Sequence, residues 1–411
     1  MRQRSSLRPQ KSPSSTLPIV KINRRAALRL RAGHPWVYRS DLIPTEEIEP
    51  GALVSIADEQ QRVLGSGLYS SSSQIALRLL SSREIAEADL PALIADRVRS
   101  ALHYRERLEI QKSANAYRLV FSEADQIPGL IADRYNDVIT VQFLTQAMDR
   151  PELRKSVLDV LVEELSPQAV VERVEPHLRE LEQLPPIPGG LLYGEKTRTM
   201  IEMNGLSFAY DAAAGQKTGA FLDQRENYAA AAQFAGGRAL DVFCYQGGFA
   251  LHLARVCVEV TGVDASRPAL EQADANAALN KERLPQSPEW IEANAFDLLR
   301  DYSDAGEKYD TIVLDPPAFA KSKRALPTAL RGYKELNLRA LKMLNPGGLL
   351  VTCSCSHHVS QQDFLEMLHN AATDARRRLR LVEVRGQGKD HPVIAGIPET
   401  AYLKCVIAIA D

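Results

Sequence analysis

The sequence lacks long apolar runs, a dense set of cysteines and an appreciable net charge. No uninterrupted apolar stretch approaches the roughly 20 residues that cross a bilayer, so no membrane segment is predicted. The five cysteines are an odd number in a chain of 411 residues, which is typical of reduced thiols in the cytoplasm. A net charge of −2 with 25% charged residues is ordinary for globular proteins, and the length predicts two or three domains.

Acidic residues are missing from the first 40 positions, which carry ten Lys or Arg residues. This asymmetry predicts a surface that binds nucleic acid. Residues 1–17 are interpreted as a disordered basic tail. An Arg- and Ser-rich segment without acidic residues is also typical of organelle targeting, so that alternative stays open.

Residues 18–82 contain short apolar stretches separated by glycines, which predicts a small β-barrel. The predicted strands are Ile19–Ile22, Ala52–Ala57, Val63–Tyr69 and Ile75–Leu80. Between the first two, a basic segment ending at Tyr38 resembles the opening of a PUA domain, a small RNA-binding pseudo-barrel. The predicted contacts to RNA phosphates and bases come from Arg24, Arg25, Arg31 and Trp36. In the alternative interpretation Trp36 and Tyr38 belong to the barrel core, and only the arginines face outward.

Residues 83–205 are predicted to form a linker helix and a small central α+β domain. Apolar residues recur at helical spacing from Leu90 to Leu108, and a second helix is predicted at Glu152–Leu165. Asn204-Gly205 separates two alternating stretches, which predicts a hairpin of Thr199–Met203 and Leu206–Tyr210. The acidic residues near the turns of this region have no His or Cys at metal-ligand spacing, so they are interpreted as turn formers and no metal site is predicted.

Residues 206–411 are predicted to form a Rossmann-like domain, because strands and helices alternate there as in a doubly wound parallel sheet. The first strand is expected at Ala239–Phe243 and the second at Val258–Asp264, with a glycine-containing turn and a helix between them. Such a turn lets a ligand approach the backbone closely. The carboxylate of Asp264 is then positioned to accept hydrogen bonds from ribose hydroxyls.

The dinucleotide-binding pattern G-x-G-x-x-G is missing, because this turn contains only Gly247 and Gly248 side by side. Asp241, which closes the first strand, would repel a pyrophosphate but suits the ammonium group of an amino-acid-like ligand. Both observations favour S-adenosyl-L-methionine over a dinucleotide. The segment before the sheet is expected to line the pocket, unless it only caps the helix that begins near Asn227. The candidate cofactor-binding residues are Phe221, Asp223, Arg225, Asp241, Phe243, Tyr245, Gly247, Gly248, Asp264, Ala265, Ser266, Asn294, Ala295, Asp315 and Pro316.

A candidate reactive site begins at Asp315, which ends a predicted strand and precedes two prolines. The prolines rigidify the following chain and so pre-organise the carboxylate. Pro317, Lys321 and Lys323 are expected to contact the substrate, the lysines through its phosphate backbone. Similar motifs bind the exocyclic amine in adenine-modifying methyltransferases, so Asp315 alone does not identify the base.

Cys353 and Cys355 occur where an apolar strand is expected to give way to a loop. A thiolate that adds to C6 of a pyrimidine makes C5 nucleophilic, whereas methylation of an amine or a guanine nitrogen needs no covalent help. A catalytic cysteine would therefore indicate C5 of cytosine or uracil, with His357 and His358 as groups that favour the thiolate. Both thiols stay candidates, because strand positions two apart share a face, and both are alternatively inert strand residues.

The sequence resembles the bacterial large-subunit ribosomal RNA cytosine-C5 methyltransferases from about Ile19 onward. Members join a PUA domain, a central α+β domain and a Rossmann-like methyltransferase domain, which is the fold expected here. The resemblance is carried by His34–Trp36, Pro128–Leu130, Gly219–Arg225, Tyr245–Phe249, Asp315–Pro317, Gly332–Lys334, Ser354–Ser356 and His391–Val393.

This resemblance implies that Cys355, rather than Cys353, is the nucleophile, and that Asp315 binds the cytosine near N3 and its amine. It also implies S-adenosylmethionine as cofactor and large-subunit (23S) ribosomal RNA as partner; a homodimer is a further expectation. Gln246 departs from the family, whose members commonly carry a small hydroxyl residue there. The alternatives are a guanine-N7 methyltransferase, whose related family lacks the Ser-Cys-Ser unit, and a non-catalytic RNA-binding or ribosome assembly factor.

Overall fold

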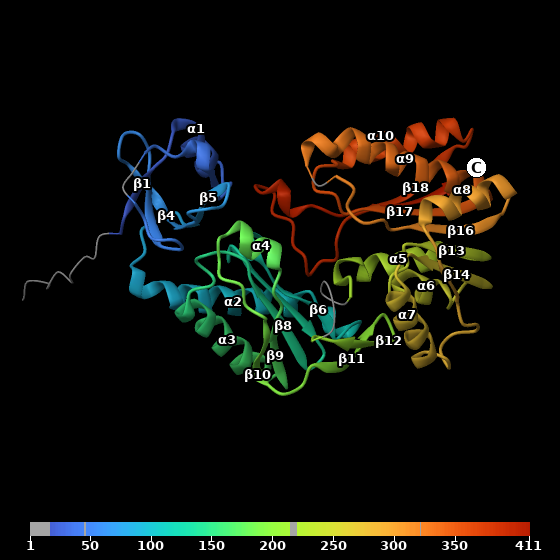
Figure 1. Ribbon diagram of the computed structural model, residues 1–411, viewed down its shortest axis with the longest axis horizontal. Helices are drawn as coiled ribbons and strands as arrows, with labels where there is room; N and C mark the ends of the chain where they lie inside the picture. Colours follow the sequence, from blue (N-terminus) through green and yellow to red (C-terminus); the bar gives the residue numbers. More distant parts are fainter. Residues whose placement is uncertain (1–16, 45–46, 214–219, 321) are drawn as a thin grey trace, which may run out of the picture.

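The N-terminal part of the protein is a five-stranded sheet of order β1-β3-β4-β5-β2. The structure is a computed structural model that describes residues 17–44, 47–213, 220–320 and 322–411 (Figure 1). The strands are β1 (Ile19–Lys21), β2 (Trp36–Tyr38), β3 (Leu53–Ala57), β4 (Val63–Tyr69) and β5 (Ile75–Ser81). The four strands predicted from the sequence are therefore confirmed to within a residue at each end.

Helix α1 (Arg24–Arg31) interrupts this sheet and was not predicted. The Asn23 side chain accepts a hydrogen bond from the Ala26 amide over 2.9 Å and so caps the first turn. Ala26, Ala27 and Leu30 are buried, whereas Arg24, Arg25 and Arg31 are exposed and Arg29 is half-buried in an ion pair with Asp41. Because only three small or medium apolar residues mark its buried face, the helical period is weak in the sequence.

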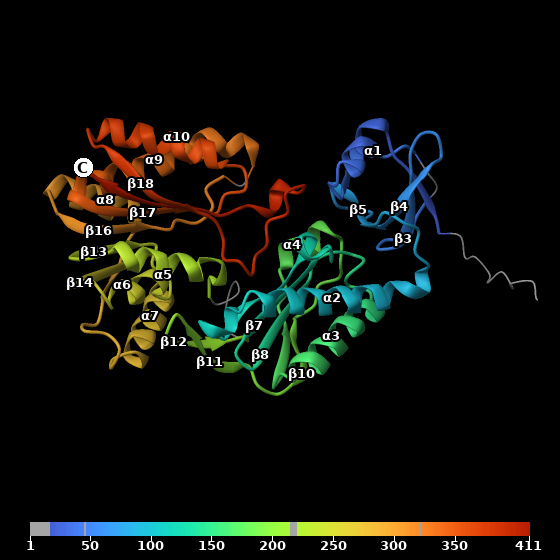
Figure 2. The ribbon, with the colours of Figure 1, turned by 180° about the vertical axis from the view of Figure 1, so that it is seen from behind.

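The central part is a second five-stranded sheet of order β10-β9-β8-β7-β6, with two long helices packed against it (Figure 2). Its strands are β6 (Ala116–Phe121), β7 (Leu130–Tyr135), β8 (Val138–Phe143), β9 (Ala169–Glu172) and β10 (Gly190–Gly194). The helices are α2 (Leu90–Arg107) and α3 (Pro151–Leu165), with the short α4 (Pro176–Leu181) after β9. Both long helices were predicted, and α3 begins one residue earlier than expected.

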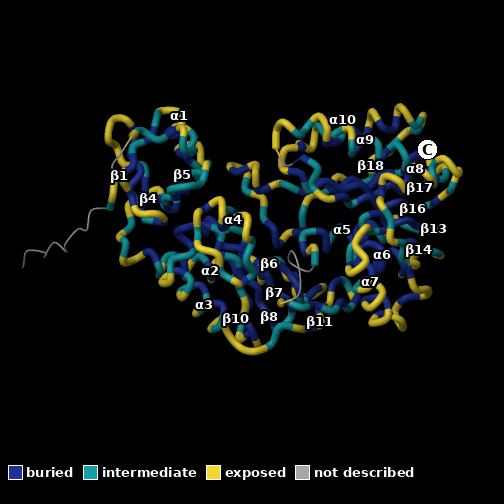
Figure 3. The backbone as a smooth tube through the Cα atoms, viewed as in Figure 1, coloured by how far each residue is buried: buried dark blue, intermediate teal, exposed yellow. Residues whose placement is uncertain are grey.

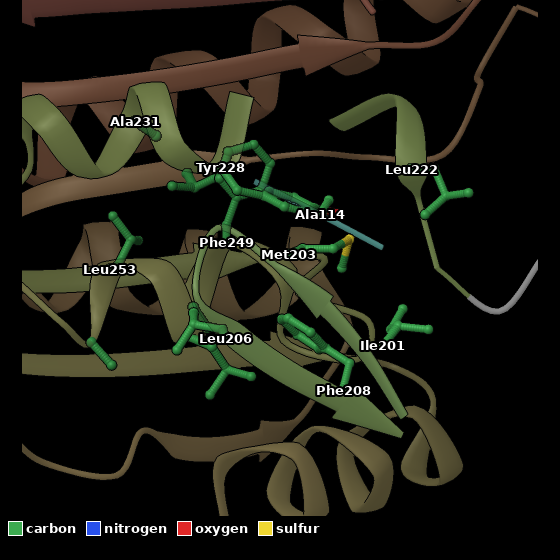
Figure 4. Packing of buried hydrophobic residues seen from close by; sticks show 14 of the residues in the cluster. Ala114, Ile201, Met203, Leu206, Phe208, Leu222, Tyr228, Ala231, Phe249 and Leu253 are labelled. Atoms are coloured by element: carbon green, nitrogen blue, oxygen red, sulfur yellow. The ribbon is translucent and has the colours of Figure 1, made fainter. Parts of the chain in front are cut away.

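A hairpin of β11 (Arg198–Met203) and β12 (Leu206–Asp211) joins the central part to the C-terminal domain. Its turn residues Asn204 and Gly205 have φ of 52° and 80°, as two-residue hairpin turns require, so the predicted turn is confirmed. The apolar face of the hairpin packs on helices of the C-terminal domain, as Figure 4 shows for Phe208 and Leu206 beside Phe249 and Leu253. The hairpin thereby forms one wall beside the C-terminal sheet.

The C-terminal sheet has seven strands in the order β15-β14-β13-β16-β17-β19-β18. They are β13 (Arg238–Val242), β14 (Glu259–Asp264), β15 (Glu289–Glu292), β16 (Tyr309–Leu314), β17 (Leu344–Ser354), β18 (Leu379–Arg385) and β19 (Lys404–Ala410). The first five are parallel, but β19 runs antiparallel to both β17 and β18. The Rossmann-like expectation is confirmed, with the correction that the sheet is mixed at this edge.

Helices cover both faces of the C-terminal sheet, which is why its central strands are buried on both sides. One face carries α5 (Arg225–Phe234), α6 (Gly248–Leu253) and α7 (Arg267–Leu279); the other carries α8 (Ala295–Ala305), α9 (Leu326–Met343) and α10 (Gln361–Asp374). The buried residues follow the strands through this layer (Figure 3). The chain order reverses between β13 and β16, and open α/β sheets bind ligands at such a point, beyond the carboxyl ends of the strands.

The connection between β18 and β19, residues 386–403, extends from the C-terminal sheet toward the other two parts of the chain (Figure 1). His34 Nε2 lies 3.2 Å from Glu399 Oε2, and Arg105 donates to the Asp390 carbonyl over 2.7 Å. We call residues 386–403 the bridging loop. No helix within the described residues is both long enough and apolar enough to span a membrane.

Candidate active site

A cavity of about 430 Å³ lies where the chain order of the C-terminal sheet reverses. Its walls come from the carboxyl ends of β13, β14 and β16, from the β11–β12 hairpin and from the segment before α5. The predicted site residues that line it are Phe221, Asp223, Phe243, Tyr245, Gly248, Asp264, Ala265, Asp315, Pro316, Pro317 and Cys355. The fold therefore brings most of the predicted cofactor residues together with both predicted catalytic residues.

The turn after β13 has an unusual backbone that shapes one end of the cavity. Phe243 and Tyr245 have φ of 69° and 49°, a left-handed conformation that is rare for bulky residues and concentrates at functional sites. The Asp264 carboxylate holds this turn, because it accepts hydrogen bonds from the Tyr245 amide (3.0 Å) and the Ser266 amide (2.8 Å). Each carboxylate oxygen retains a lone pair, so Asp264 remains able to bind ribose hydroxyls at the cavity.

Gly248 opens α6 with its backbone directly on the cavity. A Cβ atom at this position would lie 2.5 Å from the Tyr228 ring, so a side chain does not fit without moving that ring. Gly247 has φ of 84° and caps α6, but it lies outside the cavity lining. Gly248 thus lets a ligand lie close to the backbone, and Gly247 forms the turn that brings Gly248 to the cavity.

Asp241 lies at the carboxyl end of β13 and is fully buried. Its Oδ2 accepts from the Ala250 amide over 2.8 Å, while Oδ1 has no hydrogen-bond partner among the described residues. Burial, and then the nearby Asp315 and Asp264 charges, raise the pKa of this carboxyl well above its ordinary value. An unsatisfied buried oxygen beside two further carboxylates suits a cationic ligand group, which fits the amino-acid end of S-adenosylmethionine.

Besides Asp241 and Gly247, four further predicted cofactor residues lie outside the cavity lining. Asn294 Oδ1 accepts from the Phe296 amide and caps α8, with Ala295 as the first residue of that helix; Ser266 caps α7. The fourth, Arg225, is 1% exposed and forms an ion pair with Asp390 at 3.0 Å. The prediction that Arg225 lines the pocket is therefore wrong. Its guanidinium binds Asp390 and so holds the bridging loop.

Asp315 follows β16 directly and lines the cavity. Burial, and then the Asp223 charge, raise the pKa of its carboxyl to about 7, against the opposing effect of a hydrogen bond with Gln224. The neutral and ionised forms of Asp315 are thus both accessible near neutral pH. This carboxyl is able to donate a hydrogen bond to a base and not only to accept one.

The two candidate cysteines are in different surroundings. Cys353 is fully buried within β17, directly opposite Cys405 of β19. Cys355 lies just beyond the end of β17, where the alternation of strand faces no longer applies, and its partly exposed side chain lines the cavity with Asp315. Burial, followed by the Asp315 and Asp223 charges, raises the pKa of Cys355 to about 11, whereas Lys404 lowers it.

Two family models match the sequence. A PUA-like domain matches residues 20–82, and the S-adenosylmethionine-dependent methyltransferase family matches residues 132–407. The protein named ribosomal RNA large subunit methyltransferase I from Shewanella denitrificans is 39% identical over 402 residues, which cover 95% of this chain and 98% of that protein. The protein of the same name from Tolumonas auensis is 37% identical over 404 residues, with 97% and 100% covered.

This chain belongs to the ribosomal RNA large subunit methyltransferase I family. It is accordingly an S-adenosylmethionine-dependent methyltransferase with a PUA-like N-terminal domain, as the sequence predicted. The fold is also that of two solved structures of low sequence identity. A putative methyltransferase complexed with SAH has a TM-score of 0.82 and 18% identity, covering 96% of this chain and 100% of that one. A putative S-adenosylmethionine-dependent methyltransferase from Streptococcus mutans gives 0.81 with the same identity and coverage.

The residues predicted to contact RNA lie mostly on the surface of this methyltransferase. Arg24 and Arg25 are exposed on α1, and Arg31 is exposed but pairs with Asp58 at 2.8 Å. Lys323 is exposed after the cavity-lining Pro317, and Lys321 lies outside the described residues. Within the described part of the chain, no group of three or more His, Cys, Asp or Glu residues is arranged to hold a metal ion.

Trp36 has a structural contact that the sequence could not show. Its indole Nε1 donates to Glu123 of the central part over 3.0 Å, and its ring is only partly exposed. Trp36 is therefore half-buried and is not one of the buried core residues of the barrel, and its N–H edge contacts the central part of the chain instead. The exposed arginines of α1 remain the basic surface of the PUA-like domain.

Two residues for which the sequence predicted no role of their own, Ser356 and Lys404, hold the chain that follows Cys355. The buried Ser356 Oγ accepts from the Ala320 amide over 3.1 Å and lies 2.9 Å from the Tyr333 hydroxyl. The Lys404 ammonium donates to the Ser356 carbonyl over 2.6 Å. Only one signal in the sequence marked Lys404, namely a charged residue at the start of an otherwise apolar strand.

His357 does not supply the positive charge that the sequence suggested for the thiolate. Its ring stacks on Tyr402 with a centroid distance of 5.4 Å. Burial, and then the Lys404 charge, lower the pKa of His357 below its ordinary value. The imidazole is therefore uncharged at neutral pH.

Proposed function

We propose that this methyltransferase modifies C5 of a cytosine in large-subunit (23S) ribosomal RNA, in the cytoplasm, through a covalent adduct of Cys355 at C6. The observation that carries the proposal is the shared cavity, which Cys355 and Asp315 line together with the candidate cofactor residues. Relatives of the chain over nearly its whole length are named ribosomal RNA large subunit methyltransferases, which supports the RNA class.

The chemistry assigns separate roles to the two side chains. The Cys355 thiolate forms a bond to C6, and the electron pair of the C5–C6 double bond becomes available at C5. Bound S-adenosylmethionine would supply an electrophilic methyl group for that carbon, and the electron pair of its broken S–CH3 bond would stay on sulfur, which leaves S-adenosylhomocysteine. Loss of the C5 proton then restores the C5–C6 double bond and expels the thiolate, so that the enzyme is regenerated.

Asp315 is proposed to select cytosine at this site. Its raised pKa of about 7 makes the neutral carboxyl available as a hydrogen-bond donor. Cytosine N3 is an acceptor and needs such a donor, whereas N3 of uracil carries a hydrogen and needs an acceptor. A donated proton at N3 also stabilises the electron pair released by attack at C6.

All three parts of the chain are proposed to bind RNA. They are a PUA domain at residues 18–82, a linker helix with a central domain at 83–205, and the methyltransferase domain at 206–411. The exposed Arg24 and Arg25 would contact phosphates. The target base would be turned out of its stack into the cavity, which costs a few kcal/mol and least where the base is unpaired. The exposed ring of Phe221 lies at this cavity and suits stacking on a base.

The deciding experiment is incubation with ribosomal RNA that contains 5-fluorocytosine, in the presence of S-adenosylmethionine. Fluorine at C5 cannot leave as a proton does, so the adduct should persist and be visible as a protein–RNA species on a denaturing gel. Cys355→Ala should abolish trapping, whereas the matched variant Cys353→Ala should retain it. Trapping that depends on Cys353, or a methyl group mapped to a guanine by mass spectrometry, would overturn the proposal.

A further inference from the structure

Lys404 is the first residue of β19, and its side chain lies inside the protein, where it interacts electrostatically with Cys355. It is 6% exposed, which is unusual for lysine because a buried ammonium loses its hydration. The register of the sheet pairs Lys404 with Ser354, the last residue of β17. Its ammonium is therefore held at the point where the strand ends and the Cys355 loop begins.

Two carbonyl groups hold this ammonium. Lys404 Nζ donates to the Ser356 carbonyl over 2.6 Å and to the Tyr402 carbonyl over 2.8 Å. The first belongs to the residue after Cys355, and the second to the end of the bridging loop. An ammonium has three N–H donors, and the described residues supply no acceptor for the third. Lys404 thus retains one N–H donor close to the Ser356 carbonyl, in the residue that follows Cys355.

The surroundings of Cys355 otherwise oppose a thiolate. The acidic groups that face it are Asp315 after β16 and Asp223 before α5, and both disfavour a second negative charge. Tyr333 of α9 also interacts with Cys355, but its phenol is neutral at neutral pH because burial raises its pKa. His357 is uncharged for the reason given above, and Lys404 favours the thiolate.

We propose that Lys404 is a positioning residue for the methylation reaction, which holds the Cys355 loop through Ser356 and supplies the positive charge that stabilises the Cys355 thiolate. This inference rests on the proposed function of Cys355. Burial lowers the pKa of Lys404 to about 8, an effect that Cys355 opposes, so the amine is largely protonated at pH 7 and loses its charge in mildly alkaline solution.

The test measures the thiol directly and needs no RNA. The rate of alkylation of Cys355 by iodoacetamide is followed against pH by peptide mass spectrometry; Cys355 is the partly exposed cysteine, and the other four are buried. Lys404→Gln retains N–H donors without the charge, and Lys404→Met provides a second neutral side chain. Lys404→Arg keeps the charge, and Lys308→Gln is the control, because Lys308 also donates to a carbonyl but lies exposed at the other end of the sheet.

Both neutral variants should raise the apparent pKa of Cys355 by about one unit or more, which slows alkylation about tenfold near pH 7.5. Lys404→Arg should retain most of the reactivity, and Lys308→Gln all of it. Thermal unfolding checks that each variant is folded. An unchanged profile in either folded neutral variant would overturn the proposal, as would an equal loss in the arginine and neutral variants. A methyl group found on guanine would refute the proposed cytosine methylation. It would not change the pH profiles of Cys355 alkylation, so the two proposals can fail separately.

Discussion

The ion pair of Arg225 and Asp390 provides a direct test of how the bridging loop is held. Both side chains are buried, with 1% and 0% exposure, and Asp390 accepts two hydrogen bonds from Arg225 at 3.0 and 3.1 Å. The Asp390 carboxylate also accepts from the Arg118 amide over 2.8 Å, so it connects the loop to the central sheet. Arg225→Met retains the apolar part of the side chain but removes the guanidinium, so that the buried carboxylate keeps only His391, whose Nδ1 lies 3.3 Å from Asp390 Oδ1, as a basic side chain.

The expected cost is about 3–5 kcal/mol in the free energy of unfolding, which is the range for breaking one partner of a buried pair. Urea titration followed by circular dichroism measures it. The matched control is Arg198→Met, because Arg198 pairs with Asp211 at 2.7 Å but is 85% exposed. Such a surface pair contributes about 0–1 kcal/mol. A loss below about 1 kcal/mol in Arg225→Met would refute the assignment of this pair as the anchor of the loop.

The pH dependence of the same pair has a definite sign. Burial alone would raise the pKa of Asp390, but His391 and Arg225 more than offset this and hold it well below its ordinary value. A carboxyl whose pKa is lowered on folding contributes stability above its unfolded pKa of about 3.9, and that contribution is lost as the pH falls. The difference between the wild type and Arg225→Met should therefore be constant from pH 7 to 5 and shrink below about pH 4.

Two further predictions concern the cavity. Gly248→Ala would place a Cβ atom 2.5 Å from the Tyr228 ring, which is itself packed on Phe249, so the strain should weaken S-adenosylmethionine binding by about tenfold or more in calorimetry. Affinity equal to that of the wild type would contradict the close approach at this glycine. Asp315→Asn should lower kcat about 100-fold, because a positioned acid contributes roughly that much. In the wild type the Asp315 contribution should also decline above about pH 7, and a methylation assay of the variant should show no such decline.

The sequence predicted the features whose causes are local. The Asn204-Gly205 turn was identified because two adjacent residues with positive φ need those side chains. The parallel strands were found because burial on both faces gives continuous aliphatic runs such as Leu349–Val351. The end of β16, one residue before Asp315, was predicted to within a residue from the same pattern together with the two prolines.

The missed or misplaced features depend on partners far away in the chain. Arg225 resembled a ligand residue, but its partner Asp390 is 165 positions later and leaves no local trace. The sequence did not indicate a role for Lys404, because its carbonyl partner Ser356 lies 48 positions earlier, directly after Cys355. Cys353 and Cys355 could not be ranked by strand alternation, because their difference depends on where β17 ends.

The position of β19 has a consequence for the order in which the protein is made. β19 is synthesised after both of its neighbours, yet it lies between them, so β18 joins the sheet only once β19 has emerged, whereas β17 already pairs with β16. The same strand brings Lys404 to the Cys355 loop and completes the connection to the bridging loop. A growing chain therefore holds Cys355 in an unfinished setting, because the cavity wall and the loop contacts beside it are complete only after this late strand has been inserted.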